Sequence, residues 1–300
     1  MTTKVLTYTP LELRLADFAN RGILRFDDAV EVTSPDEADF IICPISLWDL
    51  KNSGGEIEKL PWMKGHSRKH VFFDVADNGE TFPGIDSIFL RCYLTKDMQR
   101  ANPRSLCVAW PTSSSGDYTA PFPVPADGFK FDVSYRAWLS SDTRKQCAKS
   151  ITETFGDRAD TDYLSTFTGY CWQEEEGLRR RREFRRSMTE SRLMICPSSI
   201  PGIFAYRFWE GMAAGRVSVL FCSNHVWPFE WEVDWKSCCF EFPAERAHEA
   251  GPICKEILAT HDDKTLIEMG MRARAIFEKY VDDRIWPNIH RRLSEKAMRT

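Results

Sequence analysis

Short apolar runs alternate with amphipathic segments along the first third of the chain. The strands predicted from these runs are residues 4–8, 30–33, 40–43, 70–74, 87–90 and 106–110. Residues 10–22 have the apolar spacing of a helix and end at Gly22, a residue type that often terminates helices. Largely apolar strands separated by helices predict a parallel sheet that is covered on both faces.

The same alternation returns after a proline-rich stretch. Residues 111–128 contain four prolines with Ser and Gly and no periodicity, which is typical of a linker. Beyond it we predict strands at 129–138, 192–197, 216–222 and 237–243, and helices at 140–156, 172–191, 204–215, 244–260 and 264–298. We therefore predict two α/β domains, residues 1–120 and 121–300, with the terminal helices either staying in the second domain or packing back on the first. Ligands of such folds bind beyond the carboxyl ends of the strands, so the expected site is a cleft between the domains.

Composition narrows the class of protein only slightly. The net charge of −4 gives no general drive toward nucleic acid, and no apolar run approaches the roughly 18 residues of a membrane span. The first residues lack the pattern of a secretory signal, so we expect a cytoplasmic protein, in the host cytoplasm if it is viral.

Cysteine and histidine spacing gives no metal signature. The ten cysteines form no CxxC pair, so we expect buried free thiols in a reducing compartment. His66 and His70 are four residues apart, but we expect both at the surface, and we predict no metal site.

The segment 205–235 carries the densest candidate chemistry. Arg207 and Glu210 are three residues apart in the first turns of a predicted helix, so they share one face. An arginine near the start of a helix suits a phosphate, and a carboxylate beside it can accept hydrogen bonds from a ribose diol. On spacing alone, a surface Arg–Glu pair explains the two residues as well.

This segment resembles the core motif of the exostosin-type glycosyltransferases. In that family a strand ending in Cys-Pro is followed by a loop, an Arg-x-x-Glu helix, a Gly, a β-branched strand, a polar turn, Pro-Phe and a Trp. The matching residues are Cys196, Pro197, Arg207, Glu210, Gly215, 217–220, 223–224, 228–229 and Trp235. Residues 34–44, 70–79 and 132–146 resemble earlier segments of the family in the same order. This chain departs from the pattern at Gly211, at residues 216–218 and at Asn224, which bears on the identity of the donor sugar.

The resemblance implies a GT-B type fold, in which two Rossmann-like domains with parallel sheets face a central cleft. It implies a metal-independent, inverting hexosyl- or pentosyltransferase that uses a nucleotide-diphosphate sugar, most often a UDP-sugar, and needs no cofactor. Glu210 would hold the ribose, Arg207 the diphosphate, and Arg144 would balance the charge of the departing diphosphate. By itself, Arg144 is equally explained as an exposed helix arginine.

The resemblance implies further donor contacts in the turn after the β-branched strand. Asn224 and His225 would border the base or the sugar, and Phe229 would pack beneath it. Asp160-Thr161-Asp162 has the spacing of the metal-binding DxD motif, but we expect it to form a turn and a helix cap.

Inverting transfer needs a base that takes the proton of the acceptor hydroxyl. We expect this base beyond a strand end of the first domain. Asp77, after the strand 70–74, is the first candidate and Asp49 the second, although each also suits a turn.

Two acceptors remain open, a glycan and DNA with hydroxymethylated bases, which some viruses glycosylate. Residues 178–186 carry six arginines on a predicted helix, of which Arg179, Arg182 and Arg186 are candidate nucleic-acid contacts. A solvated helix balanced by residues 174–176 explains them equally. An alternative function is a non-catalytic nucleotide- or sugar-binding module of the same fold.

Overall fold

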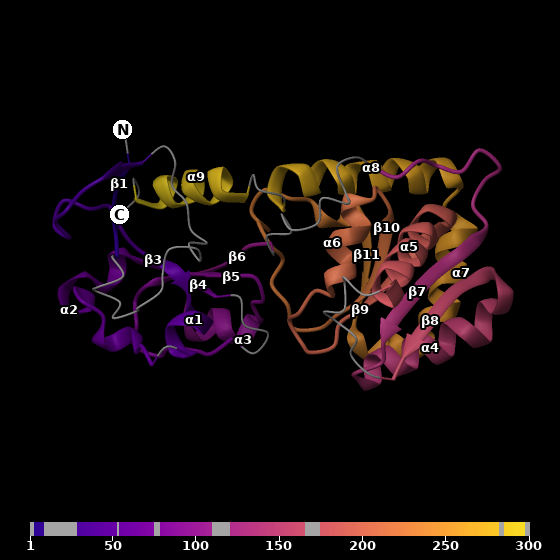
Figure 1. The fold of residues 1–300 in the computed structure, drawn as a ribbon, viewed down its shortest axis with the longest axis horizontal. Helices are drawn as coiled ribbons and strands as arrows, with labels where there is room; N and C mark the ends of the chain where they lie inside the picture. The colour runs from indigo at the N-terminus through magenta and orange to yellow at the C-terminus, as the bar shows by residue number, and fades with distance from the viewer. Residues whose placement is uncertain are drawn as a thin grey trace. The chain divides into compact units, whose positions relative to one another are not determined.

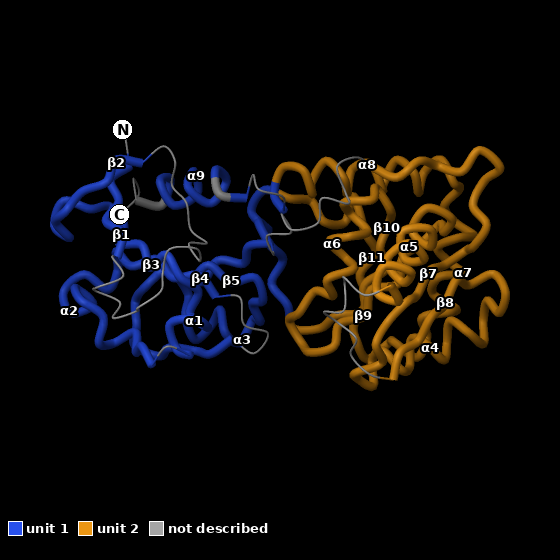
Figure 2. Tube along the Cα trace, in the orientation of Figure 1, with its two compact units in different colours: residues 1–111, 225–232, 280–300 blue, residues 112–224, 233–279 orange. Residues whose placement is uncertain are grey.

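The chain forms two compact units (Figure 2). The computed structural model describes residues 3–8, 29–52, 54–74, 79–109, 121–165, 175–281 and 285–297. Unit 1 comprises residues 1–111, 225–232 and 280–300, and unit 2 comprises residues 112–224 and 233–279. This division differs from a single boundary at residue 120, because the chain returns to unit 1 at residues 225–232 and again after residue 279.

Unit 1 is built on a six-stranded parallel sheet in the order β2-β1-β3-β4-β5-β6 (Figure 1). Its strands are β1 (Lys4–Thr7), β2 (Val30–Glu31), β3 (Phe40–Ser46), β4 (His70–Asp74), β5 (Ile88–Arg91) and β6 (Ser105–Cys107). Every residue of β3, β4, β5 and β6 is buried, which explains why these strands are largely apolar. The parallel sheet predicted from these runs is confirmed.

The helices of unit 1 include one from the end of the chain. They are α1 (Leu47–Asn52), α2 (Met63–His66), α3 (Lys96–Ala101) and α9 (Ile285–Ala297). The single helix predicted at 264–298 was wrong, since α8 (Asp263–Tyr280) belongs to unit 2 and α9 to unit 1. Pro287 explains why a new helix starts here, because a proline lacks the amide hydrogen and is tolerated in the first turn. The predicted helix 10–22 lies outside the described residues.

Unit 2 is built on a five-stranded parallel sheet in the order β11-β10-β9-β7-β8. Its strands are β7 (Phe131–Trp138), β8 (Ala159–Leu164), β9 (Ser191–Pro197), β10 (Val217–Phe221) and β11 (Cys239–Phe242). Its other helices are α4 (Asp142–Phe155), α5 (Glu175–Glu190), α6 (Tyr206–Ala213) and α7 (Ala250–Thr260). The core of this unit gathers apolar residues of β7, β9 and β10 against α4 and α7.

The two sheets share one strand order. In each unit, the second strand lies on one side of the first strand and the third lies on the other side. The order therefore switches between β1 and β3 in unit 1 and between β7 and β9 in unit 2. In open α/β sheets, ligands bind outside the carboxyl ends of the strands at such a switch. The strand order thus defines one candidate location in each unit.

Helix α6 packs closely on β10 because of one glycine. A Cβ atom on Gly211 would lie 2.9 Å from the Oγ of Ser218, closer than such atoms normally approach. Gly211 and Ser218 both stand where this chain departs from the exostosin pattern. The structure therefore gives a packing reason for Gly211.

Burial bears on two further predictions. The nine cysteines within the described ranges are free and buried, as predicted for them, whereas Cys171 lies outside these ranges. The prediction of a surface His70 was wrong, because the ring is fully buried and its Nε2 lies 2.6 Å from the hydroxyl of Tyr8. No helix in the described part of the chain is long and apolar enough to cross a membrane.

Candidate functional site

The candidate site of unit 2 lies at the carboxyl ends of β7 and β9, where the strand order switches. Strand β7 ends at Trp138, and Arg144 is the third residue of the following helix α4. Strand β9 ends at Pro197, and Arg207 is the second residue of the following helix α6. Two arginines thus begin the helices that follow two neighbouring strands.

Arg207 holds unpaired donors in a buried position. Its Nε and Nη1 atoms are both buried and have no hydrogen-bond partner in the structure. The guanidinium carbon lies 5.8 Å from the ring centre of Tyr135, a fully buried residue of β7. Burying unpaired polar atoms is costly, so native proteins usually satisfy them with protein, water or ligand atoms. Such an arginine suits a ligand anion.

Arg144 adds a second cation beside the first. Its Nη1 donates to the carbonyl oxygen of Trp138 and to the hydroxyl of Ser140, both at 3.1 Å, while its buried Nε has no partner. Burial lowers the pKa of Arg144, and the neighbouring charge of Arg207 lowers it further. Within the described ranges, no Asp or Glu forms an ion pair with either arginine. The two side chains therefore form a site of positive charge.

Glu210 lies in the same cluster. It is half-buried on α6, three residues after Arg207. Burial raises the pKa of the Cys196 thiol, at the end of β9, to about 12, and Arg207, Glu210 and Arg144 all act on this thiol by their charge. The structure thus brings together three of the residues predicted to bind the donor.

The remaining predicted donor residues divide between the units. Asn224 ends the part of the loop that belongs to unit 2 and has a left-handed backbone, with φ of 59°. His225 and Phe229 belong to unit 1, where His225 forms a bridge with Thr95. Asn224 is therefore the one residue of this group that shares a unit with Arg207.

Phe229 is a core residue of unit 1. Its side chain is 1% exposed, and its ring centre lies 5.1 Å from that of Tyr280 and 5.5 Å from that of Trp231. A ring enclosed in this way offers little surface to a nucleobase. We therefore leave Phe229 out of the proposed donor site.

Of the two candidate bases, the structure describes one. Asp77 lies outside the described residues. Asp49 lies in α1, directly after β3, and its carboxylate accepts a hydrogen bond of 2.8 Å from the hydroxyl of Ser46. The same hydroxyl accepts a hydrogen bond of 3.1 Å from the Asp49 amide, which fixes the position of Asp49.

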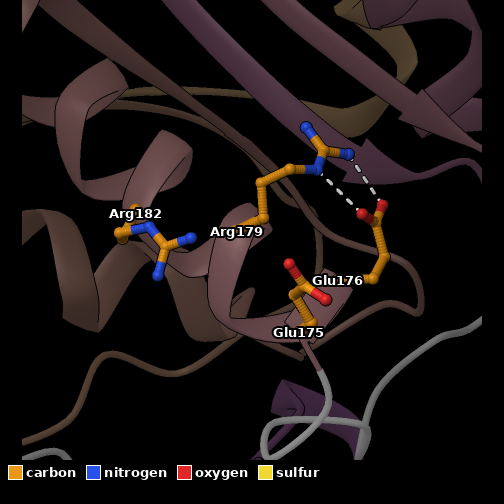
Figure 3. A pocket seen from close by; sticks show the side chains of 4 residues that line it. All are labelled: Glu175, Glu176, Arg179 and Arg182. Atoms are coloured by element: carbon orange, nitrogen blue, oxygen red, sulfur yellow. Dashed lines mark hydrogen bonds and ion pairs between the residues drawn. The ribbon is translucent and has the colours of Figure 1, made fainter.

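Three of the six arginines of α5, Arg179, Arg180 and Arg186, form ion pairs within their own helix. Arg179 forms ion pairs with Glu176 and Glu183, and Arg186 lies 3.8 Å from Glu190. Figure 3 shows the contacts between Arg179 and Glu176, with none drawn to Arg182. Arg182 is exposed and forms no ion pair with another described residue. The pairing fits the solvated-helix alternative better than a surface for an anionic partner.

The DxD-like sequence was expected in a turn, and this was wrong. Asp160 and Asp162 lie in strand β8. Arg136 of the neighbouring strand lies 2.8 Å from a carboxylate oxygen of Asp160 and 3.6 Å from one of Asp162. Both carboxylates are thus engaged by arginine, and ion pairs between strands explain how such a polar sequence forms part of a sheet.

No family model matches the chain, and no curated protein matches it by sequence. Several solved structures resemble it in fold. The Anabaena protein HepE in complex with UDP is 14% identical, with a TM-score of 0.52 over 100% of both chains. A glycosyltransferase from Rickettsia africae is 10% identical, with a TM-score of 0.50 over 99% of this chain and 98% of its own. The chain therefore has the GT-B fold of such glycosyltransferases, while the closer resemblance to the exostosin type stays a prediction.

Sequence inspection missed two aromatic residues, Tyr135 within β7 and Trp48 just after β3. Tyr135 lies under the guanidinium of Arg207, but in the sequence it is one of several apolar residues of β7. Trp48 is 58% exposed beside Asp49. Its position in the sequence, directly after an apolar strand and before a candidate base, could have identified Trp48 as a candidate.

Proposed function

We propose that this chain is a glycosyltransferase that uses a nucleotide-diphosphate sugar, and that this donor is a UDP-sugar. The observation that carries the proposal is the pair formed by Arg207 and Arg144 at the strand-order switch of unit 2. Two buried nitrogens of Arg207 and one of Arg144 lack hydrogen-bond partners there. A diphosphate supplies the charge and the acceptor oxygens that these groups need. The same fold in HepE, whose structure contains UDP, supports this choice of ligand.

The proposed roles follow from the positions of the side chains. Arg207 and Arg144 bind the diphosphate and stabilise its growing negative charge as the bond to the sugar breaks, which would make the transfer independent of a metal. Glu210 accepts hydrogen bonds from the ribose hydroxyls. Asn224, at the end of the neighbouring loop, borders the base or the sugar.

We further propose inverting transfer of a hexosyl or pentosyl group to a hydroxyl. The base is Asp77 or Asp49, beyond the strands of unit 1. The acceptor is a glycan or a hydroxymethylated base in DNA, and the ion pairs within α5 favour the glycan.

A second candidate function is a binding module that holds the same nucleotide without catalysis. The unpaired arginines support this alternative equally, because they require an anion and not a reaction. Turnover distinguishes the two functions.

A donor screen tests the proposal. The melting temperature is measured with UDP, GDP, ADP and CMP and with their sugars, followed by an assay for nucleotide release from the sugar that stabilises most. We expect stabilisation by one nucleotide family, lost in Glu210→Ala and retained in Glu268→Ala, an exposed control on α8. Binding with no release, even with acceptors, would favour the binding module. No stabilisation by any nucleotide would contradict both functions.

A further inference from the structure

Trp48 is an exposed aromatic residue on the outer side of α1. Its side chain is 58% exposed, whereas Leu47 and Leu50 of the same helix are buried. No ring contact joins Trp48 to another described residue. A tryptophan can bury about 150–250 Å² of surface, so leaving it in water forgoes a large stabilisation. An exposed indole leaves apolar surface available to pack against a ligand.

The position of Trp48 coincides with the strand-order switch of unit 1. Strand β3 ends at Ser46, and Trp48 follows two residues later at the carboxyl edge of the sheet. The order switches between β1 and β3, so this edge is where an open α/β sheet binds its ligand. The location follows from unit 1 alone.

A carboxylate of fixed position follows Trp48 in the chain. The carboxylate of Asp49 is held by the hydroxyl of Ser46, at 2.8 Å. Lys51, on the same helix, forms an ion pair with Glu80, which follows β4 in the chain. A pyranose has one face of C–H groups that can pack on an aromatic ring, and a rim of hydroxyls that can donate to a carboxylate. An exposed indole, followed in the chain by a held carboxylate, fits this chemistry.

Charge argues against a nucleic acid at the same place. Unit 1 contains 18 Lys and Arg residues and 21 Asp and Glu residues, a net charge of −3. A polyanion binds mainly through phosphate contacts with Lys and Arg. The group next to Trp48 is a carboxylate, which repels phosphate and accepts hydrogen bonds from hydroxyls.

We propose that Trp48 is the stacking surface for a pyranose ring of the acceptor, and that Asp49 accepts a hydrogen bond from a hydroxyl of this ring. The inference rests on the proposed function in one respect, because it identifies the bound sugar as the acceptor of the transfer. Binding of the ring itself is independent of the donor site and of turnover. The proposal makes Trp48 a determinant of acceptor specificity and the acceptor a carbohydrate.

Saturation-transfer NMR on the full chain tests the proposal. The probes are disaccharides that end in glucose, galactose, mannose or N-acetylglucosamine, and a single-stranded DNA that contains hydroxymethylcytosine, each with and without UDP. The variants are Trp48→Ala and Trp48→Phe, with Val30→Ala as a control because Val30 is an exposed apolar residue of the same unit. We expect a disaccharide to bind the wild type. We expect Trp48→Ala to weaken it about tenfold, as removal of a stacking aromatic does elsewhere, while Trp48→Phe and Val30→Ala keep most of the binding.

Three outcomes of the NMR experiment would overturn the proposal. Equal disaccharide binding by the wild type and Trp48→Ala would overturn the proposal, as would binding of the DNA alone or of no probe. The thermal shift with UDP is measured on the same variants and should be unchanged in Trp48→Ala. A wild type that shows a normal UDP shift but binds no sugar would refute the role of Trp48 and leave the donor site standing, whereas a wild type that shows neither would refute the proposed function as well.

Discussion

Two arginines with buried nitrogens that lack hydrogen-bond partners are the most informative side chains of the molecule. A buried guanidinium without a partner lowers the stability of the ligand-free protein, because its hydration is lost and nothing replaces it. Arg207 is in this state at two of its nitrogens, and Arg144 at one. Proteins retain such a destabilising group where a ligand needs it. The unpaired donors therefore favour a binding role over a structural one.

Replacing Arg207 should stabilise the ligand-free protein. We expect Arg207→Met to raise the free energy of unfolding by about 1 kcal/mol, because methionine fills similar space without an unpaired charge. Urea unfolding of the wild type and the variant measures this difference. The control is Lys145→Met on α4, whose exposed side chain should change stability by less than about 0.5 kcal/mol. A clear loss of stability in Arg207→Met would show that the arginine is structural.

The spacing of Arg207 and Glu210 predicted that these two residues would share a face, because that geometry is local to one helix. Arg144 lies more than 60 residues earlier in the chain, and only the adjacency of β7 and β9 brings it to them. Local patterns cannot show which strands are neighbours. The resemblance to a known family supplied Arg144, and sequence spacing could not have done so.

Among the strands, β8 shows why a polar sequence can be misjudged. Its stretch Ala159–Leu164 includes two aspartates, so the residues alone favoured a turn. In the sheet, Arg136 of β7 donates to Asp160 through two nitrogens, at 2.8 and 3.3 Å. The pair is largely buried, with side chains 12% and 8% exposed. A partner on another strand thus compensates for the low strand propensity of Asp.

Stability should depend on pH through this pair. Burial alone would raise the pKa of Asp160, but hydrogen bonds from Arg136 and Ser187 lower it below its usual value of 3.8. A lowered native pKa means that the pair stabilises the fold above pH 3.8 and that this contribution is lost as the pH falls through the native pKa. We expect Arg136→Met to cost about 2 kcal/mol at pH 7, and less as the pH falls below about 4.

Urea unfolding at several pH values measures this dependence. Arg158→Met is a matched control, since Arg158 pairs with Asp132 at 2.7 Å but its side chain is 59% exposed, and should cost under about 1 kcal/mol. An equal cost of Arg136→Met at pH 7 and pH 3 would rule out the ion pair as the cause.

The molecule as a whole contains two parallel sheets. The apolar runs predicted most of their strands but not the strand order that the two sheets share. The assignment of late segments to unit 1 could not be obtained in the same way. Residues 225–232 follow β10 of unit 2, yet the amides of Val226 and Phe229 donate to the carbonyl oxygens of Leu94 and Cys107 in unit 1. Such hydrogen bonds join residues more than 100 positions apart, and a sequence pattern does not encode them. For this reason sequence spacing could not show that His225 and Phe229 belong to unit 1.

Titration calorimetry with UDP and UMP is the measurement on which the proposed function of the molecule chiefly depends. UMP lacks the second phosphate, so the difference between the two affinities reports the group that Arg207 and Arg144 are proposed to bind. We expect UDP to bind the wild type about 10- to 100-fold more tightly than UMP, from charge-assisted hydrogen bonds of about 1.5–3 kcal/mol. In Arg207→Met this ratio should fall toward one, while Lys145→Met should keep it. Equal affinities for UDP and UMP in the wild type would contradict a diphosphate site at the strand ends of unit 2.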